Sequence, residues 1–114
     1  TLSHEQYRPF VIFHRIQAAA MLALEESGGE AAIETINQGL DRMREVYARF
    51  EAAEEFEEDE LVEQLNLMKE SLRQEYHVGK TLAEQLADAV SNEEFERAAR
   101  LRDEISRRGQ SRPK

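Results

Sequence analysis

Cysteine is absent from the 114 residues, and there are only two prolines and five glycines. Without cysteine, disulfides and thiolate metal sites are excluded, and this fits a reducing compartment, so we expect a cytoplasmic protein. Few residues that break helices are present, while alanine, leucine, glutamate and arginine are abundant. The composition therefore predicts an all-α fold, built as one small domain with or without an appendage.

A long hydrophobic run is also missing. The longest mostly apolar stretch, Ile16 to Leu24, contains a glutamine and is far too short to span a bilayer. No secretory signal is present, so we expect no contact with a membrane. Because the chain begins with threonine rather than methionine, we expect a processed product or an excised fragment.

The net charge of −9 is unevenly distributed. Residues 97–114 carry seven basic and two acidic side chains, whereas eight of the thirteen residues from Glu51 to Glu63 are acidic. Most of the chain would therefore repel a phosphate backbone. Only the C-terminal end could attract one.

Apolar residues recur at helical spacing in the first 78 residues, and no stretch alternates with a period of two. Pro9 suits the first turn of a helix and Gly28 can end one. We predict helices over about 8–27, 30–56 and 59–76, packed as an antiparallel three-helix bundle in a region spanning 1–78. The second helix carries a heptad seam of large apolar residues: Ile33, Ile36, Leu40, Met43, Tyr47 and Phe50.

Residues 79–109 form a second region, predicted to be a helical hairpin. Thr81 with Glu84 matches a capping box at the start of its first helix, which ends near Val90. Ser91 with Glu94 repeats the pattern for the second helix, which should run to about Arg108. Gly109 then stops the helix, and we expect residues 110–114 to be a disordered tail.

The hairpin contains the most specific motif of the chain. Leu82 and Leu86 are followed by a small residue, a polar turn, and Phe-Glu-Arg-Ala-Ala-Arg-Leu-Arg-Asp-Glu-Ile ending at Ile105. This stretch resembles the UVR motif, the helical hairpin shared by the bacterial excision-repair proteins UvrB and UvrC and also present in some Clp-type chaperones and their adaptors. The resemblance covers roughly a fifth of the chain.

The resemblance implies a non-catalytic module that docks on a UVR-bearing partner or on a second copy of itself, linked to excision repair or Clp-type proteolysis in a bacterium. Its contact residues would be Leu82, Leu86, Phe95, Ala98, Ala99, Leu101 and Ile105, with Arg102 and Asp103 as a polar rim. Because Arg102 and Asp103 are adjacent, they should point apart and need separate partners. The alternative is that the same apolar residues pack on the first three helices.

A weaker resemblance lies between Ile16 and Leu40, where the order of small and large residues loosely follows a single tetratricopeptide hairpin. The residues concerned are Ala20, Ala32, Ile36 and Gly39. Repeat proteins generally need about three copies, and an ordinary antiparallel helix pair explains the same pattern.

Chemical sites are poorly supported. The histidines His4, His14 and His77 form no pair at a spacing of three or four residues. The acidic run lacks the central glycine of a calcium loop, and there is neither a phosphate-binding loop nor a nucleophile elbow. We therefore expect no enzyme, no metal and no cofactor.

The arginine-rich end leaves an alternative function open, that of a regulator or adaptor that contacts DNA. Its residues would be Arg100, Arg107, Arg108 and Arg112. No aromatic side chains are interleaved with them to stack on bases, so the pattern disfavours a nucleic-acid partner.

Overall fold

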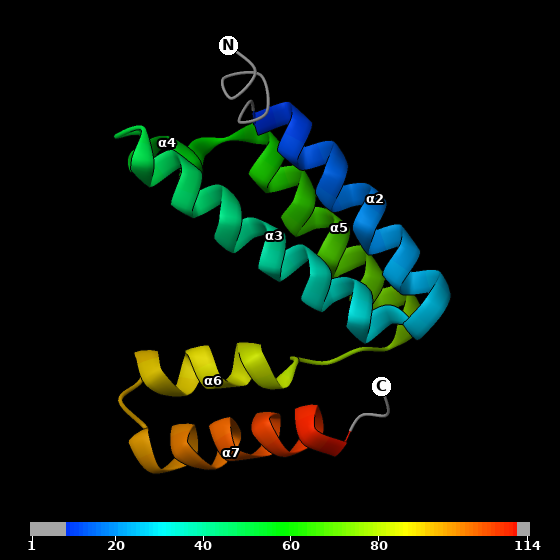
Figure 1. Cartoon of the computed structure of the whole chain (residues 1–114), viewed down its shortest axis with the longest axis vertical. Helices are drawn as coiled ribbons and strands as arrows, with labels where there is room; N and C mark the ends of the chain where they lie inside the picture. The colour runs from blue at the N-terminus through cyan, green and yellow to red at the C-terminus, as the bar shows by residue number, and fades with distance from the viewer. Residues whose placement is uncertain (1–8, 112–114) are drawn as a thin grey trace. The chain divides into compact units, whose positions relative to one another are not determined.

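A computed structural model describes residues 9–111, with side chains from Phe10 to Gly109. These residues form six α-helices and no strand, which confirms the all-α class. The chain divides into two compact units, Thr1–Val78 and Gly79–Lys114, which we call the bundle unit and the hairpin unit. Each is described by itself (Figure 1).

The bundle unit contains α2 (Pro9–Ser27), α3 (Gly29–Arg49), α4 (Ala53–Glu58) and α5 (Glu60–Tyr76). Gly28 separates α2 from α3 with a φ of 96°, a conformation that costs glycine little. The long helices α2, α3 and α5 lie side by side (Figure 1). The single helix pair α2–α3 therefore accounts for the residues that loosely resembled a tetratricopeptide hairpin.

The helix predicted over 30–56 is wrong in its second part, because α3 ends at Arg49 and the short helix α4 follows. Glu51 adopts a left-handed φ of 56°. The N–H groups of Glu51 and Ala52 donate to the carbonyls of Ala48 and Tyr47, at 3.1 and 2.8 Å, which is the hydrogen-bond pattern of a Schellman motif. Residues 9–78 therefore form four helices rather than three. Phe50, predicted on the seam, is exposed.

The core lies between α2, α3 and α5. Its buried residues are Phe13, Ile16, Ala20, Ala32, Ile33, Ile36, Leu40, Met43, Tyr47, Phe56, Val62, Leu65 and Leu72. Gly39 allows α2 and α3 to approach closely, because a Cβ atom there would lie 2.6 Å from Cδ1 of Ile16. The heptad seam of α3 is thus confirmed up to Tyr47.

The turn before α5 is held by Asp59. Its carboxylate accepts a hydrogen bond from the N–H of Leu61 at 2.7 Å, as an N-cap does, and another from the hydroxyl of Tyr47. The ring of Tyr47 meets that of Phe56 edge to face, with centroids 5.7 Å apart. Burial, followed by the hydrogen bond to Asp59, raises the pKa of Tyr47 above its ordinary value.

The hairpin unit contains α6 (Leu82–Ser91) and α7 (Phe95–Ser111). The prediction that Gly109 stops the last helix is wrong, since α7 continues through it to Ser111. A single glycine costs only about 1 kcal/mol inside a helix, so α7 can continue through Gly109. A Cβ atom added at Gly109 would meet nothing within 4 Å. The rest of the predicted tail, residues 112–114, lies outside the described residues.

Candidate protein-interaction site in the helical hairpin

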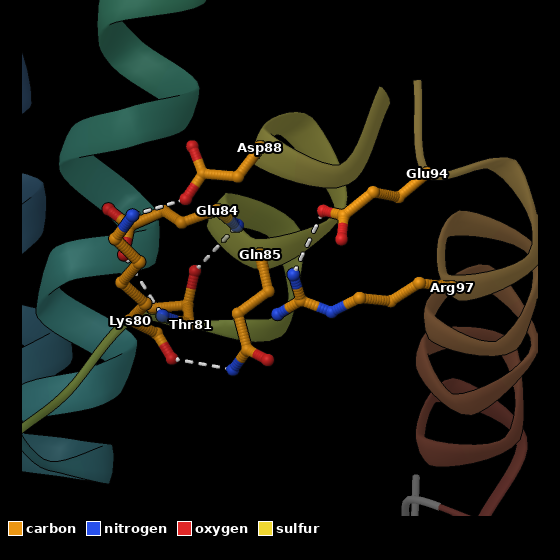
Figure 2. A network of polar contacts seen from close by, with 7 residues as sticks. All are labelled: Lys80, Thr81, Glu84, Gln85, Asp88, Glu94 and Arg97. Atoms are coloured by element: carbon orange, nitrogen blue, oxygen red, sulfur yellow. Dashed lines mark hydrogen bonds and ion pairs between the residues drawn. The ribbon is translucent and has the colours of Figure 1, made fainter. Parts of the chain in front are cut away.

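The start of α6 is fixed by the predicted capping box, which is confirmed. The N–H of Thr81 donates to Oε1 of Glu84 at 2.9 Å, and the N–H of Glu84 donates to Oγ1 of Thr81 at 3.1 Å. Figure 2 shows this pair beside the ion pair of Lys80 with Asp88 and the hydrogen bond from Gln85 to the Lys80 carbonyl. Thr81 is fully buried. The capping box and the Gln85 hydrogen bond therefore satisfy backbone groups at the start of α6.

The turn between the helices differs from the prediction. Ser91 is still helical, Asn92 ends α6, and Glu93 adopts a left-handed φ of 58°. The N–H groups of Glu93 and Glu94 donate to the carbonyls of Val90 and Ala89, at 3.1 and 2.8 Å, so a second Schellman motif closes α6.

The second capping box is therefore wrong. Helix α7 begins at Phe95, with the Glu94 carbonyl accepting from the N–H of Ala98 at 2.9 Å. The Glu94 carboxylate instead lies 3.4 Å from Nη1 of Arg97, as Figure 2 shows.

The interior of the hairpin uses part of the predicted contact set. Ala89 is fully buried, and Ala98 and Leu101 are each 8% exposed. Leu82 and Leu86 pack against these three residues. Because the two alanines carry only a methyl group, α6 and α7 can approach closely at this point. These five residues therefore join the two helices.

Other members of the set remain on the surface. Phe95 is 64% exposed at the first position of α7. Ala99 and Ile105 are half-buried. The sequence thus predicted one continuous ridge, but the structure divides it into an interior and an outer part.

Val90 is an apolar surface residue that the predicted contact set omitted. It is 52% exposed in the last turn of α6, five residues before Phe95. The signal in the sequence was the position of Val90 on α6, outside the stripe formed by Leu82, Leu86 and Ala89. Val90 and Phe95 together place two large exposed apolar side chains on either side of the turn.

The predicted polar rim is on the surface, but Arg102 and Asp103 do not point apart as expected. Nε of Arg102 lies 3.9 Å from Oδ1 of Asp103, and both side chains are more than 70% exposed. A pair this long and this solvated contributes little to stability.

The arginines proposed for DNA contact do not form a purely basic surface. Arg100 and Arg107 lie on a shallow face of α7 together with Arg97, Asp103 and Glu104. Arg108 is exposed and makes a polar interaction within the chain. Arg112 lies outside the described residues. Interleaved carboxylates lower the attraction of this face for phosphates.

The remaining chemical candidates are scattered. His14 is exposed and its ring meets those of Phe10 and Phe13 edge to face, at 5.3 and 5.2 Å. His77 ends α5 in a left-handed conformation, and His4 lies outside the described residues. Within residues 9–111, no group of three potential metal ligands comes together. No helix among them is both long and apolar enough to cross a bilayer.

Comparison with known proteins identifies the hairpin. Residues 80–108 match the family model of the UvrB/uvrC motif, so the predicted resemblance is confirmed for this segment of the chain. No curated protein and no solved structure matches the chain. The match contains the capping box, the turn and the apolar positions described above.

Proposed function

We propose that this protein is a non-catalytic interaction module, which docks through its UVR hairpin on the hairpin of a UVR-bearing protein or of a second copy. The observation that carries the proposal is the exposure of Phe95 at one end of a hairpin in which five other apolar residues, Leu82, Leu86, Ala89, Ala98 and Leu101, already join α6 to α7. Exposed aromatic residues are enriched at the centres of protein interfaces. The proposed setting is bacterial excision repair or Clp-type proteolysis, in the cytoplasm.

The energy available at this site is substantial for a small module. Burying the exposed two-thirds of a phenylalanine with a surface of about 200 Å² contributes roughly 3 kcal/mol. Val90 adds a smaller term on the other side of the turn, and the half-buried Ala99 offers no bulk that would keep a partner helix away. The rigid cap and turn lower the entropy lost on docking, because the backbone of the hairpin is already ordered.

The test is the affinity of the full chain for purified UvrB and UvrC, measured by titration calorimetry, with light scattering over a concentration series to detect self-pairing. Phe95→Glu should weaken the interaction about 100-fold, the equivalent of the roughly 3 kcal/mol above. Leu67→Glu is the matched control, since Leu67 is 60% exposed but lies on α5 of the bundle unit. It should bind as the wild type does.

Three results would contradict the proposal. Equal affinities of the Phe95→Glu and Leu67→Glu variants would remove the hairpin from the interface. Loss of helix content in Phe95→Glu would mean that Phe95 belongs to an internal core. Binding to duplex DNA that weakens steeply with salt would favour the alternative of a DNA-contacting adaptor, because release of counterions from phosphates gives that dependence and an apolar interface does not.

A further inference from the structure

The side of α7 that is turned away from α6 carries four charged side chains. Ala98 and Leu101 are buried against α6. At 3.6 residues per turn, the opposite side of α7 is formed by residues spaced 4, 3 and 4 apart, the heptad spacing of a helix that pairs with another helix. All four are exposed, and we call them the charged stripe: Glu96, Arg100, Asp103 and Arg107.

The charges of the stripe are largely unpaired within the described part of the chain. Glu96, Arg100 and Arg107 make no hydrogen bond or ion pair there, and Asp103 has only the long contact with Arg102, at 3.9 Å. Carboxylates four residues before arginines can form ion pairs inside a helix. Neither of the two such pairs in the stripe is formed among the described residues. A docking surface can therefore use these charges.

The signs of the charges alternate along the stripe, and this order selects the partner. Read from Glu96 to Arg107, they are minus, plus, minus and plus. A second stripe that runs in the opposite direction places an opposite charge level with each of the four. A second stripe that runs in the same direction places like charges level instead. The stripe is therefore complementary to its own reverse, as the interface of a twofold dimer must be.

We propose that α7 binds α7 of a second copy of the chain through the charged stripe, antiparallel about a twofold axis midway between Arg100 and Asp103. In this register Glu96 of each copy lies level with Arg107 of the other, and Arg100 of each copy lies level with Asp103 of the other. A shift of one turn in either direction would bring like charges level. The charge order therefore sets both the direction and the register of the pair.

The residues beside the stripe agree with this register. On one side, Arg97 of each copy lies within two residues of the level of Glu104 of the other, so these charges are also opposite. The contact of Arg97 with Glu94 is between exposed groups and contributes little that would be lost. On the other side of the stripe, Ala99 and Ser106 are too small to keep a partner helix away.

The association should be weak, because each exposed ion pair contributes little. Residues 79–114 carry eight basic and seven acidic side chains, so two hairpins do not repel each other through their net charge. The inference rests on the proposed function, since it names the second copy as a partner of the hairpin. It does not use Phe95, which lies outside the charged stripe on α7.

The test is light scattering on the full chain over a concentration series at physiological ionic strength. The wild type should form a concentration-dependent dimer. Glu96→Arg or Arg107→Glu alone should raise the dimer dissociation constant at least about tenfold, because each places two pairs of like charges level. An equal mixture of the two variants should recover about the wild-type constant, since each chain supplies the charge that the other lacks. A chain that carries both changes should recover it as well.

The matched control is the mixture of Glu25→Arg with Arg49→Glu, two exposed positions of the bundle unit that change the net charge by the same amounts. These variants should dimerise as the wild type does, alone and mixed. Circular dichroism should give the same helix content for every variant.

A wild type that is monomeric at every concentration would overturn the inference. So would a mixture of Glu96→Arg and Arg107→Glu that associates no better than either variant alone. The titration of Phe95→Glu with UvrB and UvrC tests the proposed function separately. Failure of the mixture to recover would therefore refute the second copy as the partner of the charged stripe, whatever that titration gives.

Discussion

Replacement of Gly39 by alanine tests the close contact between α2 and α3. The added Cβ would lie 2.6 Å from Cδ1 and 2.9 Å from Cγ2 of Ile16, both side-chain atoms of a buried, β-branched residue. Overpacking of this kind costs about 2–3 kcal/mol. Alanine gains about 1 kcal/mol over glycine in helix propensity. We therefore expect Gly39→Ala to lower the free energy of unfolding by about 1–2 kcal/mol.

The assay is thermal and urea unfolding followed by circular dichroism, in which the melting temperature should fall by roughly 5–10 °C. Gly109→Ala is the control, because Gly109 is also helical but a Cβ there meets nothing within 4 Å. That change should stabilise α7 by up to about 1 kcal/mol. The same substitution is thus expected to act with opposite sign at the two positions.

A double-mutant cycle locates the cause. Ile16→Ala alone should cost about 2–4 kcal/mol through the cavity it leaves. Combined with Gly39→Ala, it should cost about 1–2 kcal/mol less than the sum of the two, because the new methyl group enters that cavity. If Gly39→Ala stabilises the chain as Gly109→Ala does, the argument from close approach is refuted.

The capping and ionisable groups give two further predictions. Glu93→Gly should stabilise the hairpin by about 0.5–1 kcal/mol, because it removes the cost of a left-handed glutamate. Thr81→Ala should destabilise it by about 1–2 kcal/mol, because it removes the N-cap. Thermal unfolding measures both changes in stability, and two changes of the same sign would contradict the assigned cap and turn. Because the pKa of Tyr47 is raised above its ordinary value of 10.0 in the folded state, its contribution to stability is complete below pH 10 and is lost as the pH rises further. The fall in the unfolding free energy above pH 10 should therefore be smaller in Tyr47→Phe than in the wild type, whereas Tyr76→Phe, at an exposed tyrosine, should follow the wild type.

Helix boundaries were predicted correctly from the local sequence where the residue type itself specifies the start or the end of a helix. Gly28 ends α2, Thr81 and Glu84 cap α6, and the heptad seam of α3 is buried up to Tyr47. These signals depend on backbone freedom, short-range hydrogen bonds and helical periodicity, all of which are local. They required no knowledge of the fold.

The left-handed turns at Glu51 and Glu93 were not predicted, for a physical reason. Both glutamates adopt left-handed conformations that their residue type disfavours. At the first ending, Ala52 packs against the core and Phe56 is buried in α4. Packing of the residues after the turn therefore offsets the strain at Glu51. The residue types at such a turn do not predict it from the sequence.

By itself, the sequence determined the helical class, the UVR motif in the hairpin and the capped start of α6, because composition, residue order and hydrogen bonding over three residues are properties of the chain alone. Only the tertiary structure decided that Ala98 and Leu101 are buried while Phe95 is exposed. An apolar residue is buried or exposed according to the rotation of its helix against its neighbours. That rotation is set by packing between segments far apart in sequence, such as Ile16 against Gly39.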